Sequence, residues 1–350
     1  MASTLNFFPG HMAKAMRQMK QIKHEVDVVI EIRDARAPFA TANHELHALF
    51  GPQKLLTVFN KVDLITHGDR ARITRYFQLQ GLREPIFLSA LSKKRHHWTG
   101  FLTAVSDRCF GAPPAIASST KMMHSSDVTD IASLSSSSSS SLPIAPITSQ
   151  RIGKSRRFST VDPTLMIAGF PNVGKSSIIA NLRNLAPPSM RHLTTGGLAE
   201  RRASPGTTRH LKSFRLVMPV SKGQGDRPSS IRVIDTPGVC MPGNQADDIG
   251  LKLALLGIIS ERIITHDEVA AFLYEQLRAK GLLQESDGGG KDDGRELPLD
   301  GRAWIKSVCE ERGFRLPKAE GSWDLYRGAA WIVREYRRGR WGKFVLDSLE

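Results

Sequence analysis

Residues 169–176 read Gly-Phe-Pro-Asn-Val-Gly-Lys-Ser, which is the spacing of a phosphate-binding loop. In such a loop, backbone N–H groups wrap phosphate oxygens, and glycine is needed because it accepts the required dihedral angles and lets the backbone approach the ligand. An apolar run at 165–168 precedes the loop and a helical pattern at 177–182 follows it, so the loop opens a helix whose N-terminus favours anions. This order of strand, loop and helix predicts an α/β fold with a nucleotide site.

The residues of this loop have separate predicted roles. Lys175 is expected to contact the β- and γ-phosphates of the nucleotide, and the Ser176 hydroxyl is expected to bind Mg²⁺. Asn172 has two interpretations, because its amide either coordinates a monovalent cation such as K⁺ beside the phosphates or stabilises the loop. The other loop residues predicted to contact the nucleotide are Gly169, Val173, Gly174 and Ser177.

A second phosphate-facing motif occurs further along the chain, where residues 235–238 read Asp-Thr-Pro-Gly after an apolar run. The carboxylate of Asp235 can hold a Mg²⁺-bound water, and the backbone N–H of Gly238 can sense the γ-phosphate. A Pro-Gly-Thr-Thr-Arg sequence between the two motifs predicts a mobile loop. We expect Thr208 of this loop to cap Mg²⁺ when triphosphate is bound, with Thr207 as the alternative.

Residues 60–63 read Asn-Lys-Val-Asp and follow another apolar run. The carboxylate of Asp63 can accept hydrogen bonds from both N1–H and N2–H of guanine, which adenine does not offer, so this motif selects GTP over ATP. Asn60 and Lys61 complete the predicted guanine-binding element. The dipeptide Ser89-Ala90 also follows an apolar run and is a candidate for donating a backbone N–H to guanine O6.

The guanine-binding motif lies far before the phosphate loop in the chain, whereas an ordinary GTPase carries the two in the reverse order. The set of ligand-binding elements is therefore complete, but the chain that holds them is circularly permuted.

The residue after Gly238 is Val239, at a position where many GTPases have a Gln that orients the attacking water. Valine cannot hydrogen-bond to water, so we expect slow turnover unless the chain, a cation or a partner supplies the missing group.

Six apolar β-rich runs separated by helical or polar segments predict a mostly parallel sheet. Helix-length connections such as Ala40–Phe50 and His67–Gln80 are typical of a doubly wound α/β domain, in which ligands bind at the carboxyl ends of the strands. We therefore predict an α/β fold, a circularly permuted P-loop GTPase domain with a six-stranded sheet, over residues 1–246. The runs are Val26–Ile32, Leu55–Phe59, Pro85–Leu88, Thr164–Ala168, Phe214–Val217 and Ile231–Ile234.

Two further segments differ from this domain. Over about residues 112–157 we predict a disordered insert, because Ser, Pro, Ala and Thr dominate there and offer little apolar surface to bury. Over residues 247–350 we predict an all-α C-terminal domain, because apolar residues recur at three- and four-residue steps. Its expected helices are Leu251–Ile259, Asp267–Lys280, Arg302–Arg312 and Trp323–Arg338, with a polar loop at Glu285–Gly294.

The chain is strongly basic, because 49 Lys and Arg against 34 Asp and Glu give a formal net charge of +15 over 350 residues. Such an excess favours a polyanionic partner, nucleic acid first and an anionic membrane surface second.

Three cysteines without paired spacing predict neither a disulfide framework nor a zinc site, and they favour a reducing compartment. Because the sequence has no membrane-length apolar stretch and no secretory signal core, we expect neither secretion nor membrane insertion.

The order of these motifs resembles that of the circularly permuted ribosome-assembly GTPases. Two more segments extend the likeness: residues 7–15 read Phe-Phe-Pro-Gly-His-Met-Ala-Lys-Ala, and residues 34–38 read Asp-Ala-Arg-Ala-Pro. Together with the closing Tyr-Arg-Arg-Gly-Arg-Trp-Gly-Lys at 336–343, they look like the bacterial ribosome-biogenesis GTPase A (YlqF) group and its mitochondrial counterpart. The resemblance covers nearly the whole chain except the Ser-rich insert.

This resemblance implies a GTPase that docks on the large ribosomal subunit through rRNA, promotes late maturation and translation, and hydrolyses GTP when stimulated there. It also implies that His11 supplies the missing catalytic group, with a structural or rRNA-contacting role as the alternative. Lys175, Thr208 and Gly238 complete the predicted catalytic set. We expect a monomer that binds GTP or GDP together with Mg²⁺. A role for K⁺ is expected only if the Asn172 side chain coordinates that cation.

A basic cluster near the C-terminus suits RNA, because cations that contact phosphates alternate there with aromatic rings that stack on bases. We expect the cluster to bind rRNA, and a solvated basic face is the alternative. Its members are Arg334, Arg337, Arg338, Arg340 and Lys343, interleaved with Tyr336 and Trp341.

The segment Met12–Lys23 is basic, rich in Met and free of acidic residues, so it is either a mitochondrial targeting helix or a surface helix that packs its Met side on the domain. The Ser tract and the resemblance favour the matrix side of a mitochondrion, with peripheral contact to the inner membrane. A plastid, a bacterial cytoplasm and the cytosol are the alternatives.

Two other functions compete with this interpretation. A non-ribosomal signalling or membrane-associated GTPase would use the positive charge to bind anionic lipid. A GTP-gated rRNA-binding module would bind nucleotide with negligible catalysis. Co-sedimentation with large subunits tests the first, and GTP turnover with and without those subunits tests the second.

Overall fold

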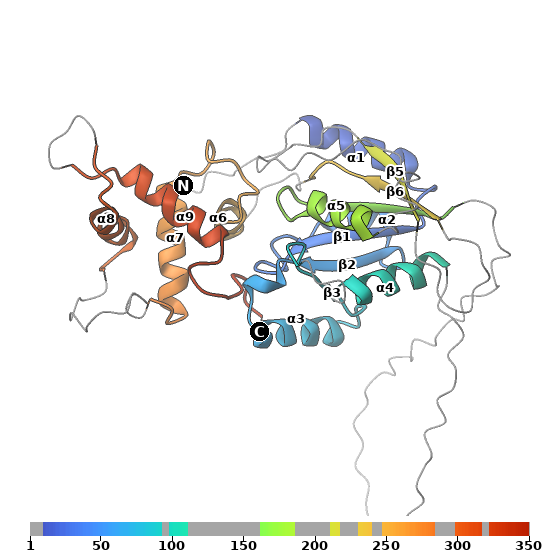
Figure 1. Cartoon of the computed structure of the whole chain (residues 1–350), viewed down its shortest axis with the longest axis horizontal. Coiled ribbons are helices and arrows are strands. Elements are labelled where there is room, and N and C mark those ends of the chain that lie inside the picture. The colour runs from blue at the N-terminus through green and yellow to red at the C-terminus, as the bar shows by residue number, and fades with distance from the viewer. Residues whose placement is uncertain are drawn as a thin grey trace, which may run out of the picture. The chain divides into compact units, whose positions relative to one another are not determined.

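The computed structural model describes residues 10–92, 98–110, 162–185, 211–217, 230–239, 247–283, 298–316 and 322–349. These residues contain a six-stranded sheet with the strand order β3-β2-β1-β4-β6-β5 (Figure 1). The strands are β1 (Val28–Asp34), β2 (Leu55–Asn60), β3 (Ile86–Phe87), β4 (Thr164–Gly169), β5 (Lys212–Val217) and β6 (Ser230–Asp235).

Neighbouring strands pair in parallel except at one edge, where β5 runs antiparallel to β6. The predicted mostly parallel, six-stranded sheet is therefore confirmed. Strand β4, which leads into the phosphate loop, lies between β1 and β6, and β2, which ends at Asn60, lies on the far side of β1. Because β2, β1, β4 and β6 are parallel, their carboxyl ends share one edge of the sheet, where the permuted motifs can meet.

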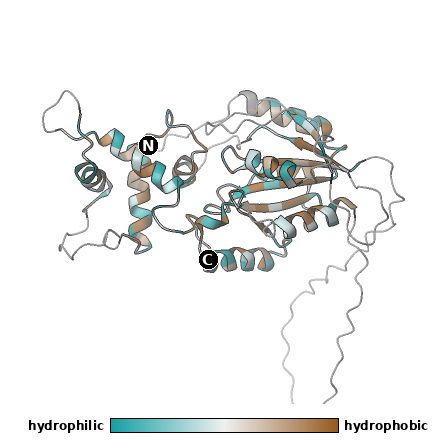
Figure 2. Ribbon diagram, viewed as in Figure 1, coloured by the Kyte–Doolittle hydropathy of each residue, from teal (hydrophilic) through white to brown (hydrophobic). Residues whose placement is uncertain are grey.

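Helices cover both faces of this sheet, as the predicted doubly wound architecture requires. On one face, Met19 of α1, Leu46 of α2 and Ile73 of α3 are buried in clusters with strand residues. On the other face, Phe101 of α4 and Ile178 of α5 are buried against the strands. Figure 2 shows that the strands between the helices are largely hydrophobic. The helices are α1 (Gly10–Ile22), α2 (His44–Phe50), α3 (His67–Leu79), α4 (Thr99–Phe110) and α5 (Lys175–Leu185).

Helix α1 contains most of the Met-rich segment whose role the sequence left open. Its residues Met16 and Met19 are buried in the cluster that also holds Val29 and Met166 of the sheet. This packing agrees with the surface-helix interpretation of Met12–Lys23, and the targeting interpretation stays untested.

The helices that flank the guanine motif begin at caps encoded in the sequence. At the start of α3, the Thr66 hydroxyl accepts a hydrogen bond from the Asp69 backbone N–H at 3.0 Å, and the Asp69 carboxylate accepts one from the Thr66 N–H at 3.1 Å. This reciprocal capping box satisfies backbone donors that the first helical turn leaves unpaired. At the start of α2, the Asn43 side chain caps the N–H of Leu46 at 3.2 Å.

Strand β1 is buried along its whole length although it carries the charged residues Glu31 and Arg33. Arg33 Nη2 donates to Glu31 Oε2 at 2.6 Å, and His47 Nε2 lies 2.8 Å from the same oxygen. The other oxygen, Oε1, accepts a hydrogen bond from the Asn43 N–H at 2.7 Å. Burial raises the pKa of Glu31, but Arg33 and His47 outweigh it and lower that pKa to about 2. The ionised Glu31 therefore fixes the start of α2 to the central sheet.

The C-terminal part of the described chain is helical, as predicted, and has an aromatic core. Trp304 packs against Tyr274 and Trp341, with ring centroids 5.7 Å and 5.1 Å apart. Gly328 approaches Cys309 so closely that an added Cβ would lie 2.3 Å from the cysteine Sγ, so this crossing requires glycine. The helices are α6 (Asp247–Leu255), α7 (His266–Ala279), α8 (Gly301–Arg312) and α9 (Leu325–Arg337). A domain boundary between residues 246 and 247 stays a prediction.

The segment after α9 contacts the first half of the chain. The Leu346 N–H donates to the Arg36 carbonyl at 2.7 Å. The Asp347 carboxylate accepts the backbone N–H groups of Phe39 at 2.7 Å and Ala40 at 3.0 Å. Val345 is buried in a cluster with strand β2 and helix α3. The end of the chain thus packs on the turn that follows β1.

Several predictions lie outside the described residues. They concern the Ser-rich insert at 112–157, Thr207 and Thr208, the loop Glu285–Gly294, and Cys240. Within the described ranges, none of the helices has both the length and the apolar character needed to cross a membrane.

Candidate functional site

One buried side chain, Asn60, connects the three loops that the sequence assigned to nucleotide binding. Its Nδ2 donates to the Val173 carbonyl of the phosphate loop at 2.8 Å. Its Oδ1 accepts the Ala90 backbone N–H at 2.9 Å. The guanine motif, the phosphate loop and the Ser89-Ala90 segment are therefore held together at the carboxyl edge of the sheet, as the permuted order predicted.

Two neighbouring residues support this connection. Asn181 of α5 donates its Nδ2 to the Ala90 carbonyl at 2.6 Å, so Ala90 is bonded from both sides. Gly174 has φ +102°, and a Cβ added to it would lie 2.1 Å from Asn60 Nδ2. Glycine at position 174 is therefore required both by its backbone conformation and by the approach of Asn60.

Replacing Asn60 by alanine is expected to weaken GTP binding at least tenfold, because it releases the loops from one another. The change leaves the Val173 carbonyl and the Ala90 N–H without their buried partner, and each such loss costs about 1–3 kcal/mol. Equilibrium titration with a fluorescent GTP analogue measures the effect. Gln78→Ala on the exposed side of α3 is the matched control. Unchanged affinity in Asn60→Ala would contradict the assigned role.

Lys175, the first residue of α5, is buried beneath the phosphate loop. Its Nζ donates to the carbonyls of Gly169 at 3.0 Å and Phe170 at 2.7 Å. Gly169 itself has φ +146°, and an added Cβ would lie 2.3 Å from the Ile32 carbonyl oxygen of β1. The loop therefore follows a path that only glycine permits, and it holds an ammonium group where phosphate oxygens are predicted to bind.

Asp235 ends β6 directly beside the phosphate strand, opposite Ile167. It is 3% exposed, and its Oδ1 has no hydrogen-bond partner among the described residues. Burial raises the pKa of Asp235, and the nearby Lys175 opposes that rise. A buried carboxylate oxygen of this kind suits a divalent cation, which would favour the ionised form.

The residues after Asp235 lie against the phosphate loop. Thr236 donates its hydroxyl to the Ile167 carbonyl at 2.9 Å, and the Val239 N–H donates to the Gly169 carbonyl at 3.2 Å. A Cβ on Gly238 would lie 2.7 Å from the backbone nitrogen of Pro171, so this contact also requires glycine. The Asp-Thr-Pro-Gly motif and the phosphate loop thus form one surface.

Comparisons with known proteins agree with this geometry. The model of the family described as 50S ribosome-binding GTPase matches residues 164–280. Mitochondrial ribosome-associated GTPase 1 of Xenopus tropicalis is 27% identical over 358 residues, which cover 98% of this chain and 94% of the relative. Ribosome biogenesis GTPase A of Priestia megaterium is 22% identical over 356 residues, which cover 99% and 97%. The GNP-bound structure of YlqF from T. maritima shares the fold, with a TM-score of 0.51 at 18% identity over 96% of this chain and 99% of that one.

The chain is a circularly permuted GTPase. In this GTPase, Val239 is 2% exposed and packs with Ala168 and Ile234 in the sheet core. Its carbonyl accepts the Asn43 Nδ2 at 3.1 Å, which fixes it further. Val239 therefore serves packing, and its side chain offers no hydrogen bond to a water molecule.

The predicted catalytic residues His11 and Thr208 are only partly covered by the structure. His11 lies in the first turn of α1, but its side chain is not among those described. Thr208 falls between α5 and β5 in the sequence and lies outside the described residues. The catalytic roles of both stay predictions.

The guanine end of the site includes an ion cluster that the sequence analysis missed. Lys61 has φ 64° and donates its Nζ to Asp34 Oδ2 at 2.7 Å. Arg36 binds both oxygens of the same carboxylate at 3.0 Å and 2.9 Å. Burial opposes ionisation of Asp34, but Arg36 and Lys61 prevail and hold its pKa well below the usual range. In the sequence, residues 34–38 indicated only a resemblance to a family. An Asp and an Arg two positions apart at the end of a buried strand nevertheless predict an ion pair of this kind.

Asp63 lies just beyond this cluster, in the 3₁₀ turn η1 (Val62–Leu64) that follows β2. It is exposed, whereas Asn60 is buried and Ser89 and Ala90 are 9% exposed. The motif thus combines a buried amide that fixes the loops with an exposed carboxylate that suits a purine edge.

Asn172 makes a contact that bears on both of its interpretations. It has φ 58°, and its Nδ2 donates to the Gly257 carbonyl after α6 at 2.5 Å. This hydrogen bond agrees with an amide that stabilises the loop. A cation at Asn172 would have to use Oδ1 instead.

The basic cluster near the C-terminus is arranged differently from the sequence expectation. Arg334, Arg338 and Arg340 have side chains 58%, 57% and 70% exposed and share the carboxylate of Glu335. Tyr336 is 2% exposed, so it cannot stack on a base, and the predicted stacking role for this ring was wrong. Burial raises the pKa of Tyr336, and its ring centroid lies 5.1 Å from the Arg36 guanidinium carbon.

Arg337 and Trp341 also contribute to packing. Arg337 donates to the Leu255 carbonyl at 3.0 Å and the Ala254 carbonyl at 2.9 Å, which satisfies the C-terminus of α6. Trp341 donates its indole N–H to the Ile332 carbonyl at 3.0 Å. Some of the cations predicted to bind RNA are therefore exposed to solvent. Arg337 instead connects α9 to the end of α6.

Proposed function

We propose that this GTPase is an assembly factor that binds the mitochondrial large ribosomal subunit and promotes its late maturation and translation. The observation that carries the proposal is the joining of the guanine motif to the phosphate loop through Asn60. The relatives named as ribosome-associated and ribosome-biogenesis GTPases support the ribosome as partner, and the net charge of +15 supports rRNA as its contact.

In this proposal, the guanine ring is bound by Asp63, with Lys61 and the Ser89-Ala90 backbone beside it. The phosphates are bound by the backbone of residues 169–177 and by Lys175. Gly238 senses the γ-phosphate, because its backbone lies against the phosphate loop.

Mg²⁺ fits the site because Asp235 offers a buried carboxylate oxygen without a partner in the described part of the chain. Ser176 and Asp235 would hold the ion, with Thr208 added in the triphosphate state. When bound, Mg²⁺ neutralises charge on the phosphoryl oxygens. K⁺ at Asn172 remains part of the proposal and would use the carbonyl oxygen of that side chain.

In this proposal, hydrolysis depends on a group that does the work of the Gln found in many other GTPases. That group is either His11 or one supplied by the ribosome. GTP turnover is therefore expected to be slow alone and to rise at least tenfold with large subunits. Phosphate release with and without subunits measures this, and His11→Ala should reduce the stimulated rate without changing GTP affinity. Turnover that is barely measurable in both conditions would favour a GTP-gated rRNA-binding module.

Mitochondrial location is proposed from the names of the relatives, with a matrix-side monomer in peripheral contact with the inner membrane. Co-sedimentation with large subunits purified from mitochondria, in GTP analogue and in GDP, tests the partner. Binding to anionic lipid vesicles without co-sedimentation would favour a membrane-associated GTPase instead.

A further inference from the structure

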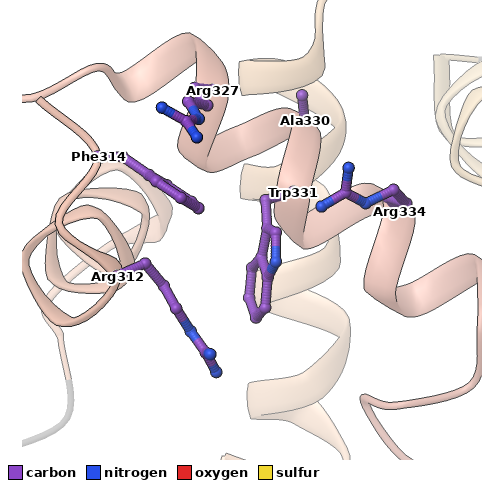
Figure 3. Close-up of a pocket in the computed structure, with 6 residues that line it drawn as sticks. All are labelled: Arg312, Phe314, Arg327, Ala330, Trp331 and Arg334. Atoms are coloured by element: carbon purple, nitrogen blue, oxygen red, sulfur yellow. The ribbon is translucent and has the colours of Figure 1, made fainter. Parts of the chain in front are cut away.

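An open pocket of about 400 Å³ lies where the end of α8 meets the outer side of α9 (Figure 3). It is separate from the nucleotide site described above. Its lining consists of three arginines, two aromatic rings and one small apolar residue: Arg312, Arg327, Arg334, Phe314, Trp331 and Ala330. Figure 3 shows the Phe314 and Trp331 side chains directed toward the space between them, with Arg312 and Arg327 at its rim.

The cations of this pocket lie on the faces of the rings. The Arg312 guanidinium carbon is 4.6 Å from the Trp331 centroid, and that of Arg327 is 4.6 Å from the Phe314 centroid. The two ring centroids are 6.5 Å apart with an interplanar angle of 62°. Planar guanidinium groups and aromatic rings are therefore presented together, a combination that stacks on nucleobases and binds phosphates.

The charge of this surface is strongly positive. No carboxylate is among the residues that line the pocket. Arg312 has an exposed partner, Glu311, at 3.6 Å, and such a pair is weak because solvent screens it. Arg334 lies 3.6 Å from Glu335, which two further arginines share. The pocket is thus complementary to an anion, and its aromatic lining also suits a ligand with a planar ring.

We propose that this pocket binds one unpaired, unstacked nucleobase of single-stranded RNA, with the adjoining phosphates held by Arg312, Arg327 and Arg334. The inference rests on the proposed function, and it specifies which feature of rRNA is bound: a loop or bulge base. Proteins recognise such bases by stacking them on aromatic and guanidinium planes, whereas double-stranded RNA offers mostly phosphates and 2′-hydroxyls. The volume also lies within the range of pockets that hold a nucleotide-sized ligand.

The pocket accounts for a discrepancy noted above. The aromatic residues predicted to stack on RNA, Tyr336 and Trp341, are used in packing. Tyr336 is buried, whereas Phe314 and Trp331, which the sequence did not single out, are partly exposed, as Trp341 also is. Arg334 belongs to both the predicted cluster and the pocket, so the two surfaces are continuous along α9.

The test uses the full chain with a GTP analogue and a single-stranded RNA of about eight nucleotides, a length typical of such sites. Fluorescence anisotropy compares this RNA with an abasic strand of equal length and with a duplex. The double variant Arg312→Gln/Arg327→Gln is expected to bind the single strand at least tenfold more weakly and with a smaller salt dependence. Phe314→Leu is expected to weaken binding while leaving the salt dependence unchanged.

The control is Arg278→Gln/Arg302→Gln, which removes the same charge from exposed positions on α7 and α8. An equal loss of RNA affinity in this control variant would overturn the proposed base-binding pocket, because it would show that RNA is held only by non-specific charge attraction. Equal wild-type binding of the abasic strand or of the duplex would also overturn it, as would preference for an acidic peptide. If the pocket variant binds RNA normally while the wild type co-sediments with large subunits, only this inference fails. If the wild type does not co-sediment, the proposed function fails.

Discussion

Replacing Lys175 by alanine is expected to reduce GTP affinity more than 100-fold while the chain stays folded. The Lys175 ammonium lies beneath the phosphate loop and bonds two of its carbonyls, so in the proposed complex it contacts phosphate oxygens without solvent between them. Hydrogen bonds to charged groups contribute about 1.5–3 kcal/mol each, and two of them account for a factor of this size. Loss of the ammonium also removes a charge that lowers the pKa of Asp235.

Isothermal titration with GTP and GDP measures this effect, and thermal unfolding checks the fold. Lys306→Ala removes a lysine that is 60% exposed on α8 and serves as the control. GTP affinity within a few-fold of the wild type would remove Lys175 from the phosphate site. A proportionate loss of GTP and GDP binding would indicate contact mainly with the β-phosphate.

Replacing Asp63 by asparagine is expected to change which base the site accepts. The carboxylate can accept two hydrogen bonds from guanine, whereas the amide offers one acceptor and an N–H donor. GTP affinity should fall by about two orders of magnitude or more, since two charge-assisted bonds are disrupted. Xanthosine triphosphate carries an oxygen where guanine has its amino group, so its affinity should rise.

Competition between GTP, ATP and xanthosine triphosphate for a fluorescent nucleotide measures this specificity. Because Asp63 is exposed and lies outside the buried cluster of Asp34, the change should leave stability nearly unaffected. Glu84→Gln, at another exposed position, is the control. Unaltered discrimination between GTP and xanthosine triphosphate in Asp63→Asn would show that the base is read elsewhere.

The mostly parallel, six-stranded sheet could be predicted because local signals indicate its strands. Each strand is an apolar run bounded by turns. The loops at the strand ends contain motifs in which glycine is required, because a larger residue would clash with the neighbouring backbone or side chain. Strand β3 is shorter than expected, Ile86–Phe87 instead of Pro85–Leu88, because only two residues pair with the neighbouring strand. Such pairing depends on geometry at the edge of the sheet, which periodicity does not encode.

The missed features depend on contacts between distant residues. Asp347 binds the backbone of Phe39 and Ala40 across about three hundred positions, and no local pattern signals an acidic residue that caps a remote turn. The aromatic ring of Tyr336 was assigned to RNA because composition alone does not reveal which side of α9 faces the core. The packing role of Arg337 was missed for the same reason, since it donates to helix-end carbonyls of α6.

The order of strands in the sheet has a consequence for synthesis. Translation delivers β1, β2 and β3 first, yet one side of β1 pairs with β4, which emerges only after residue 164. Until then the nascent chain presents an open hydrophobic strand edge that includes Val29 and Ile30, both fully buried in the finished sheet. Such edges bind chaperones or aggregate. A chain with its phosphate strand first would complete the centre of its sheet earlier, so we expect this permuted form to depend more heavily on holding chaperones while it is being made.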